Sequence, residues 1–187
     1  LYTWAGPEIS VATTKAYSCQ LAVFYLLALK FAQIRSAITP DTFQTLLTAL
    51  KQLPDQMEGL LSQKEKIQFF ANHYLATEHI FFMGRGIDYA ISMEGSLKLK
   101  EISYIHSEAY AAGELKHGTI ALIEPGVPVI ALATQDKIFA KTISNIREVK
   151  ARDAYVILIT KEGADVSDDV YDIHLEIPIE DDRFTVF

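Results

Sequence analysis

The fold is decided by residues 79–86, which read His79-Ile80-Phe81-Phe82-Met83-Gly84-Arg85-Gly86. The apolar run predicts a buried strand, and the two glycines that flank Arg85 predict a tight turn after it. Residues 87–105 then continue with the period of an α-helix. A strand, a glycine turn and a helix therefore follow one another directly in this stretch.

The same alternation continues on the C-terminal side. Apolar runs predict strands at 127–132, 155–159 and 171–175, a helix is predicted at 139–151, and residues 108–112 fit either a short strand or a loop. Continuous apolar strands that alternate with helices are typical of a parallel sheet covered on both faces. We therefore expect an α/β fold.

On the N-terminal side only helices are predicted. The first runs from Thr13 or Thr14 to about Arg35, and its run Leu21–Leu29 is apolar nearly all round, which predicts burial or packing on a partner chain. Further helices are expected from Pro40 to about Leu53, from Pro54 onward, and from Ser62 to near Leu75.

Composition excludes several classes of protein. The chain has 187 residues, a net charge of −7 and an apolar fraction of 50%. Phosphate contacts need clustered Lys and Arg, so we expect no nucleic-acid partner. The run Leu21–Leu29 is too short to span a bilayer, so no membrane partner is expected either. Cys19 alone can form no internal disulfide, and a cytoplasmic location follows as the default.

Three ionisable residues, Glu94, Lys98 and Glu101, fall on one line of the helix at 87–105. Apolar residues flank this line, and the opposite face carries Ser92, Ser96, Lys100 and Ser103, which we expect to face solvent. Buried charges are costly unless they are paired or used. The line is therefore either a set of structural ion pairs or a general acid–base site that moves a proton between adjacent carbons of a sugar.

Two loops complete the candidate site. The turn Gly84-Arg85-Gly86 precedes a helix, where backbone N–H groups can bind an anion, although a purely structural glycine turn explains it as well. Residues 113–118 predict a turn or short helix, in which His117 can protonate a ring oxygen or serve as a structural hydrogen-bonding residue. No metal ion is expected, because the histidines lack ligand spacing.

At these residues the chain resembles a known family. Residues 94–118, EGSLKLKEISYIHSEAYAAGELKHG, closely resemble the second sugar-isomerase (SIS) domain of the glucosamine-6-phosphate synthases, the isomerising glutamine–fructose-6-phosphate aminotransferases. Residues 5–17, AGPEISVATTKAY, resemble the end of the first SIS domain of these enzymes. Both motifs are long and stand in the order found in the family.

The resemblance implies a flavodoxin-like three-layer αβα sandwich preceded by N-terminal helices. Residues 1–60 would close the first SIS domain and form a helical linker, and 61–187 would be a second SIS domain that stops before its last helix. Glu101 matches the base that carries a proton between C2 and C1, and Lys98 matches a lysine beside it. His117 matches the ring-opening histidine, which a neighbouring subunit contributes in the family. Val11 and Thr13 match a sugar-contacting segment.

The implied activity is the formation of glucosamine 6-phosphate from fructose 6-phosphate, a step of amino-sugar biosynthesis, without cofactor or metal. The implied partners are the sugar phosphate, a glutaminase domain of the same parent chain and a second copy in a homodimer. Thr119 stands where the family usually has proline, so we expect a less fixed His117 loop. The phosphate cradle and the Schiff-base lysine of the family are missing from these residues, so we expect the chain alone to be inactive.

Two other functions fit the same residues. One is a non-catalytic SIS module that senses a sugar phosphate or nucleotide sugar at Gly84-Arg85-Gly86, with the charged helix line purely structural. The other is a simpler phosphosugar isomerase or deglycase of the same superfamily. The position of a bound sugar phosphate, beside Arg85 or beside Glu101, separates the first of these from the aminotransferase.

Overall fold

The computed structural model describes residues 1–73, 77–179 and 181–187. The chain divides into two compact units, one formed by residues 1–62 with Phe187 and the other by residues 63–186. Each unit is described by itself below.

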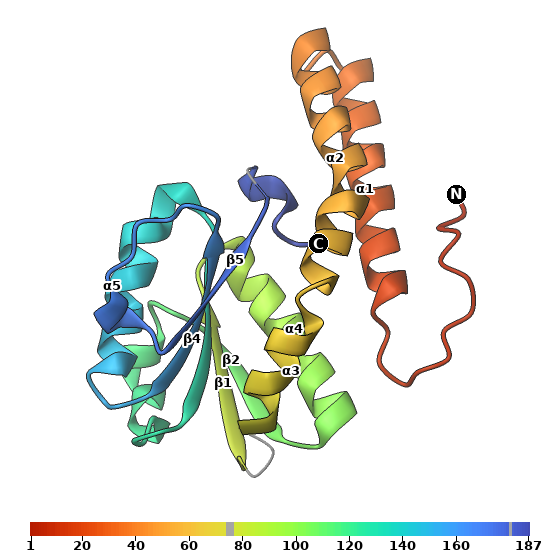
Figure 1. The fold of residues 1–187 in the computed structure, drawn as a ribbon. Helices are drawn as coiled ribbons and strands as arrows, with labels where there is room; N and C mark the ends of the chain where they lie inside the picture. Colours follow the sequence, from red (N-terminus) through yellow and green to blue (C-terminus); the bar gives the residue numbers. More distant parts are fainter. Residues whose placement is uncertain (74–76, 180) are drawn as a thin grey trace. The chain divides into compact units, whose positions relative to one another are not determined.

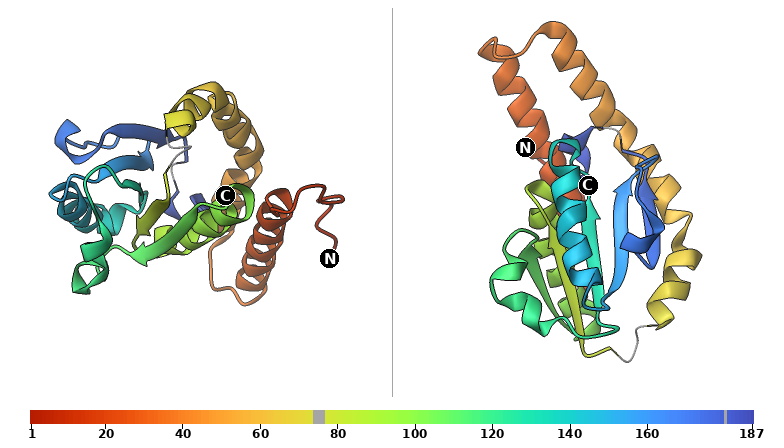
Figure 2. Two further views of the ribbon diagram at one scale, coloured as in Figure 1. Left: turned by 90° about the horizontal axis from the view of Figure 1, so that it is seen from below. Right: turned by 90° about the vertical axis from the view of Figure 1, so that its left-hand side faces the viewer.

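The first unit is a pair of helices, α1 (Lys15–Ile34) and α2 (Pro40–Leu61), which lie side by side (Figures 1 and 2). Thr39 begins α2 as predicted, because its side chain accepts a hydrogen bond from the Thr42 amide at 3.1 Å. The predicted end of this helix near Leu53 is wrong, since α2 continues through Pro54. Leu46 and Leu53 are both buried on one stripe of the helix, and this packing offsets the hydrogen bond that proline cannot make.

Helix α1 confirms the helix predicted from Thr13 or Thr14 to about Arg35, but it is more exposed than its apolar run suggested. It is long and apolar enough to cross a membrane, with a mean hydropathy of 1.3, and Leu29 is its buried residue. The run Leu21–Leu29 by itself is shorter than a bilayer span, but the whole helix has 20 residues, so the length of the run does not decide the question. Length and composition alone do not identify a membrane helix, because a helix that packs on another protein meets the same criteria.

The second unit is built on a parallel sheet. Within the described ranges the sheet has five strands, in the order β2-β1-β3-β4-β5, and every neighbouring pair is parallel. The strands are β1 (His79–Gly84), β2 (His106–Ala111), β3 (Pro128–Ala133), β4 (Tyr155–Lys161) and β5 (Ile173–Ile177). This is the flavodoxin-like order, so the predicted fold is confirmed. The open alternative at 108–112 is a strand, and β5 begins two residues later than predicted.

Helices cover both faces of this sheet. Figure 1 shows α4 (Ile87–Ser103) on one side and α5 (Phe139–Lys150) on the other. Phe81 and Met83 of β1 join the core on the α5 side, whereas Phe82 meets Gly95 of α4, as the alternation of side chains along a strand requires. The sandwich is therefore a three-layer one.

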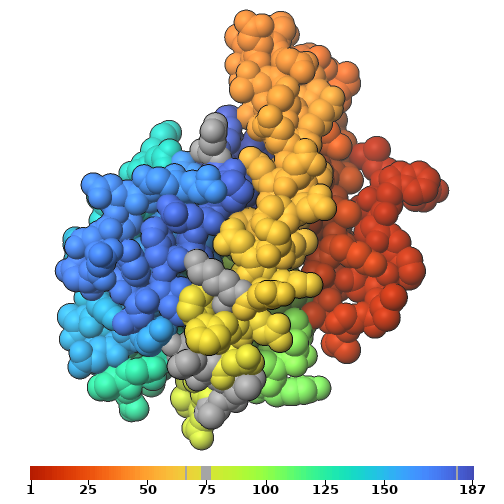
Figure 3. Space-filling model, in the orientation of Figure 1, coloured from red at the N-terminus to blue at the C-terminus, as the bar shows by residue number. Residues whose placement is uncertain are grey.

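The remaining elements are short. Helix α3 (Lys64–His73) begins the second unit, and the predicted end of this helix near Leu75 lies outside the described residues. Single 3₁₀ turns lie at η1 (Leu115–His117), η2 (Thr119–Leu122), η3 (Asp136–Ile138), η4 (Asp168–Val170) and η5 (Asp182–Phe184). Part of the C-terminal segment, blue in Figure 3, forms the surface of the second unit that this view shows.

Candidate functional site

Helix α4 packs on the sheet through small residues. Ser92 and Ser96 are buried, and a Cβ added at Gly95 would lie 3.0 Å from the Phe82 ring. Ser96 also bonds Ser107 of β2, with 2.8 Å between the two hydroxyl oxygens. The expectation that Ser92 and Ser96 face solvent is therefore wrong, because a helix that approaches a sheet this closely has room only for small side chains.

The apolar side chains of α4 face outward instead. Met93 and Leu97 are exposed by 47% and 43%, and Ile102 by 64%. Lys100 and Ser103 are exposed, as predicted. The apolar arc that periodicity assigned to the core is therefore a surface in the described chain.

The charged residues Glu94, Lys98 and Glu101 lie between two faces of α4. One is the buried contact with the sheet, which we call the seam (Ser92, Gly95 and Ser96), and the other is the exposed apolar arc. The Lys98 Nζ atom lies 2.7 Å from Glu101 Oε2 and 3.5 Å from Glu94 Oε1, and the three side chains are 18–29% exposed. The hydrogen bond to Glu101 raises the pKa of Lys98 above its ordinary value. The helix thus presents a carboxylate with an ammonium group at hydrogen-bonding distance, both within reach of solvent. A carboxylate so placed can accept a proton from a carbon acid, and the ammonium can stabilise charge on a neighbouring oxygen.

His117 lies at the end of the loop that follows β2. The backbone N–H of Glu114 bonds Ala111 O at 2.8 Å, and that of His117 bonds Glu114 O at 3.0 Å, which closes the η1 turn. Leu115 is 2% exposed and anchors the turn in the core, whereas His117 is exposed. The Thr119 hydroxyl donates to Leu115 O at 3.2 Å, and the expectation that threonine here leaves the loop less fixed than proline would stays a prediction.

Within one chain, Glu101 and His117 are not brought together. Glu101 belongs to α4, which covers one face of the sheet. His117 follows Leu115, which packs in the core on the face covered by α5. An active site that uses both residues requires His117 from a second chain.

Val11 and Thr13 belong to the first unit and precede α1. Both are exposed, while Ala12 between them is 2% exposed. Local bonds hold this segment, because the Thr14 amide donates to Glu8 Oε1 at 3.2 Å and Lys15 Nζ donates to Pro7 O at 2.7 Å.

Glu8 was not selected from the sequence. Its second carboxylate oxygen, Oε2, is buried and accepts no hydrogen bond from the described residues. A buried acceptor without a donor is costly. The sequence gives no sign of this burial, since a Glu after Gly-Pro reads as a solvated turn residue.

The backbone of the turn Gly84-Arg85-Gly86 explains why both flanking residues are glycines. A Cβ at Gly84 would lie 2.6 Å from the Asp88 carbonyl carbon, and Gly86 adopts a φ of +59°. Arg85 Nη1 donates to Asn145 Oδ1 of α5 at 2.9 Å. The anion site predicted at this turn stays a prediction, and the described contacts of Arg85 are with protein groups.

His79 and His106, which are far apart in the sequence, lie together at the amino ends of β1 and β2. Their parallel register places His79 opposite His106, with 3.2 Å between the two Nδ1 atoms. Farther along β2, the hydroxyl of Tyr110 donates to Glu108, and burial with this bond raises the pKa of Tyr110 to about 12. Within the described ranges, no group of three or more His, Cys, Asp or Glu side chains is arranged to hold a metal ion.

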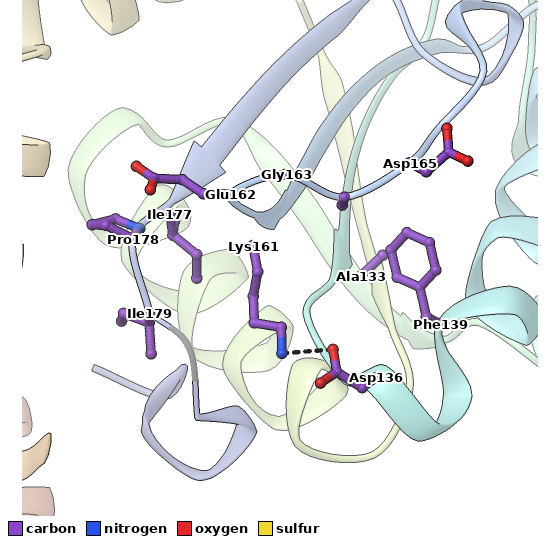
Figure 4. Close-up of a pocket in the computed structure, with 11 residues that line it drawn as sticks. Ala133, Asp136, Phe139, Lys161, Glu162, Gly163, Asp165, Ile177, Pro178 and Ile179 are labelled. Carbon is purple, nitrogen blue, oxygen red and sulfur yellow. Dashed lines mark ion pairs between the residues drawn. The ribbon is translucent and has the colours of Figure 1, made fainter.

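A pocket of about 770 Å³ lies at the carboxyl ends of β3, β4 and β5 (Figure 4). Neither Glu101 nor His117 lines it. Its lysine, Lys161, lies 2.6 Å from Asp136 and 2.7 Å from Asp182. Burial works to lower the pKa of Lys161, but the bonds to these two carboxylates outweigh it and raise that pKa. The carboxylates neutralise Lys161, and Glu162 and Asp165 add negative charge, so this pocket is unsuited to a phosphate group.

Comparisons with known proteins fit this geometry. The family model described as "SIS domain" matches residues 74–186. The glutamine–fructose-6-phosphate aminotransferase (isomerizing) of Caldanaerobacter subterraneus subsp. tengcongensis is 55% identical over 178 residues, which are 95% of this chain and 29% of that protein. The protein of the same name from Clostridium acetobutylicum is 52% identical over the same shares of the two chains. This chain therefore spans about 29% of the length of the curated relatives it matches.

A solved structure is also similar. The C-terminal domain of glucosamine-fructose-6-phosphate aminotransferase from Francisella tularensis superposes with a TM-score of 0.91 at 38% identity, and the match covers 96% of this chain and 50% of that one. The likeness includes the helices that precede the sheet as well as the sheet itself.

Proposed function

The chain belongs to the SIS domain family, and from this premise we propose that it is part of the isomerase half of an isomerising glutamine–fructose-6-phosphate aminotransferase. The observation that carries the proposal is the Lys98–Glu101 pair, held at 2.7 Å on a partly exposed helix face. The relatives at 52–55% identity, which bear this enzyme's name, support it.

In the proposed reaction, nitrogen from glutamine and the carbon skeleton of fructose 6-phosphate give glucosamine 6-phosphate. His117 would protonate the ring oxygen and open the hexose. Glu101 would remove a proton at one of the carbons C1 and C2 and return it at the other, which converts a ketose skeleton into an aldose one. Lys98 would stabilise the negative charge that develops on the adjacent oxygen. Val11 and Thr13 would contact the sugar, and no metal or organic cofactor takes part.

The domain proposal follows the same relatives. Residues 1–60 would close a first SIS domain and form a helical linker, and residues 61–187 would form the second SIS domain. The division of the chain between Ser62 and Gln63 and the family match at 74–186 support this boundary.

The proposed partners are a sugar phosphate, a glutaminase domain of the same parent chain and a second copy in a homodimer. The placement of Glu101 and His117 on opposite faces of one sheet supports the homodimer, because a complete site then needs two chains. We propose a cytoplasmic protein without nucleic-acid or membrane partners.

The test is the substitution Glu101→Gln in the intact protein that carries this segment. We expect formation of glucosamine 6-phosphate to stop while glutamine hydrolysis continues, because Gln is the same size but cannot accept the proton. Glu124→Gln, which changes an exposed glutamate of the same unit, should leave both reactions unchanged. Product formation by the Glu101→Gln protein would remove this residue from the role of base.

A ligand titration separates this proposal from the sensing module. Fructose 6-phosphate should shift the NMR signals of residues 98–101 in the intact protein. Shifts centred on residues 84–86, with none at 98–101, would favour a sensing site at the glycine turn instead.

A further inference from the structure

Arg85 reaches from the turn after β1 to two other segments of the second unit. Its Nη1 atom donates to Asn145 Oδ1 at 2.9 Å, and Asn145 is 6% exposed on the inner side of α5. The Asn145 amide in turn donates to Glu148 Oε1 at 3.3 Å. The guanidinium is therefore fixed from the α5 side by an oriented acceptor.

The same guanidinium lies directly against Gly113. A Cβ added at Gly113 would stand 2.5 Å from Arg85 Nη1, 3.3 Å from Cζ and 3.4 Å from Nη2. The φ angle of Gly113 is not positive, so its backbone conformation suits any residue. A side chain at Gly113 would therefore have to push the guanidinium of Arg85 out of the place it now occupies.

Gly113 opens the loop that carries His117. Two backbone hydrogen bonds inside this loop run from Glu114 N to Ala111 O and from His117 N to Glu114 O. A shift of Gly113 would therefore also move His117. The Ala112 amide also donates to Gly84 O at 2.8 Å, which ties this loop to the turn that holds Arg85. The turn at 84–86 and the loop at 111–117 thus form one connected structure.

We propose that Arg85 is a positioning residue, which clamps Gly113 against Asn145 and so sets where the His117 imidazole lies. Arginine suits this task because its planar group can donate to an acceptor at its edge while a glycine backbone packs on it, which a lysine ammonium cannot do. The inference rests on the proposed role of His117 for its catalytic meaning. The clamp itself is a claim about structure, and it can be tested without catalysis.

The first test measures the order of the loop in the 187-residue chain. Amide hydrogen exchange at residues 114–117 should speed up by about tenfold or more in Arg85→Lys, because the loop loses its support. Arg147→Lys, the same change at an exposed arginine of α5, should have no such effect. Protection of β3 and β4 reports whether each variant is folded. Unchanged exchange at 114–117 in a folded Arg85→Lys chain would overturn the proposal.

The second test uses Gly113→Ala, which meets the guanidinium from the other side. With Arg85 present, the added methyl group should shift the NMR signals of the His117 ring. With Arg85→Ala, the space is vacant, so adding Gly113→Ala should produce no further shift. This pattern of coupling identifies a direct contact. Independent, additive shifts from the two substitutions would overturn the clamp even where Arg85→Lys failed to fold.

The third test concerns catalysis and anions. In the intact protein, Arg85→Lys should lower kcat for isomerisation by up to about 10²-fold and change KM much less, because a displaced imidazole harms the reaction more than binding. Equal losses of kcat in Arg85→Lys and Arg147→Lys would count against positioning. Inorganic phosphate that shifted residues 84–86 and released the 114–117 loop would make Arg85 a ligand group and overturn the proposal. A failure of Glu101→Gln to stop isomerisation would leave the exchange and coupling results intact.

Discussion

Asp88 is fully buried between the start of α4 and the end of β3. Its carboxylate accepts one hydrogen bond from the Thr134 amide at 2.8 Å and another from the Thr134 hydroxyl at 2.5 Å. Burial raises the pKa of Asp88 above its ordinary value of 3.8, although the two bonds from Thr134 act in the opposite direction. The folded chain therefore favours the neutral carboxyl group more than the unfolded chain does.

This shift predicts the sign of a pH effect on stability. The stabilisation that comes from protonated Asp88 is complete below pH 3.8, and it is lost as the pH rises through the raised folded pKa. Asp88→Asn removes the titration, keeps an acceptor for the Thr134 amide and can donate to the Thr134 hydroxyl. We expect the free energy of unfolding of the unmodified chain to fall relative to that of Asp88→Asn as the pH rises from 3.8 through the raised pKa of Asp88, measured by urea denaturation.

Two further variants complete this experiment. Asp165→Asn changes an exposed carboxylate of the same unit and should leave the pH dependence unchanged. Asp88→Ala should cost about 1–3 kcal/mol at every pH, because the Thr134 donors lose their acceptor in a buried place. A stability difference between Asp88→Asn and the unmodified chain that does not change with pH would contradict this account.

At the scale of the element, α4 shows what periodicity can and cannot predict. The bounds of this helix and the line of Glu94, Lys98 and Glu101 follow from the sequence, and the structure pairs these charges as their spacing requires. Which side faces the sheet does not follow, because periodicity assumes that apolar residues are buried. In α4 the sheet is approached so closely that serine and glycine form the contact, and Met93 and Leu97 lie outside it.

The same limit applies to contacts between elements. Strands β1, β3 and β4 were predictable because each is an apolar run, whereas the more polar β2 fitted a strand or a loop equally well. The strand order matches the flavodoxin-like one implied by the resemblance. The pairing of His79 with His106 depends on strand register, and the contact of Arg85 with Gly113 depends on how two turns meet. Neither leaves a signal in local sequence. The helix end predicted before Pro54 is wrong for a related reason. The buried stripe of α2 stabilises the helix more than proline destabilises it, and this packing is not visible in the local sequence.

The contact of α4 with the sheet predicts that changing a serine of this helix costs more stability than changing an apolar residue, which is the reverse of the usual order. Ser96→Leu should lower the free energy of unfolding by about 1–3 kcal/mol, because a buried serine at a close contact leaves no room for a larger side chain. Met93→Ser, on the exposed arc of the same helix, should change it by no more than about 0.5 kcal/mol. Urea denaturation at one pH measures both. A larger loss for Met93→Ser than for Ser96→Leu would show that the apolar arc is the packed side.

At the scale of the whole molecule, the proposed active site is incomplete within one chain. Glu101 and His117 lie on opposite faces of the sheet, and the acidic pocket at the ends of β3 to β5 does not suit the phosphate group of the proposed substrate. Assembly of the site from more than one chain is the arrangement that reconciles these facts. In that arrangement, the surface through which two copies associate also decides whether the proposed active site forms.

Helix α1 offers such a surface. Phe24, Phe31 and Ile34 are exposed by 65%, 59% and 67% on a helix with no acidic residue in its first turn and no basic residue in its last. Exposed apolar area of this extent is typical of an interface. We expect the chain to self-associate at micromolar concentration, as measured by light scattering.

Substitution at α1 tests this expectation directly. Phe24→Ser combined with Phe31→Ser should give a monomer, because the polar hydroxyls remove the gain from burying two aromatic rings. Leu61→Ser combined with Leu122→Ser changes two exposed leucines elsewhere and should leave the association unchanged. Since α1 also has the length and composition of a membrane helix, flotation with phosphatidylcholine vesicles is measured alongside. A monomeric unmodified chain that floats with the vesicles would show that lipid, rather than a second copy, covers α1.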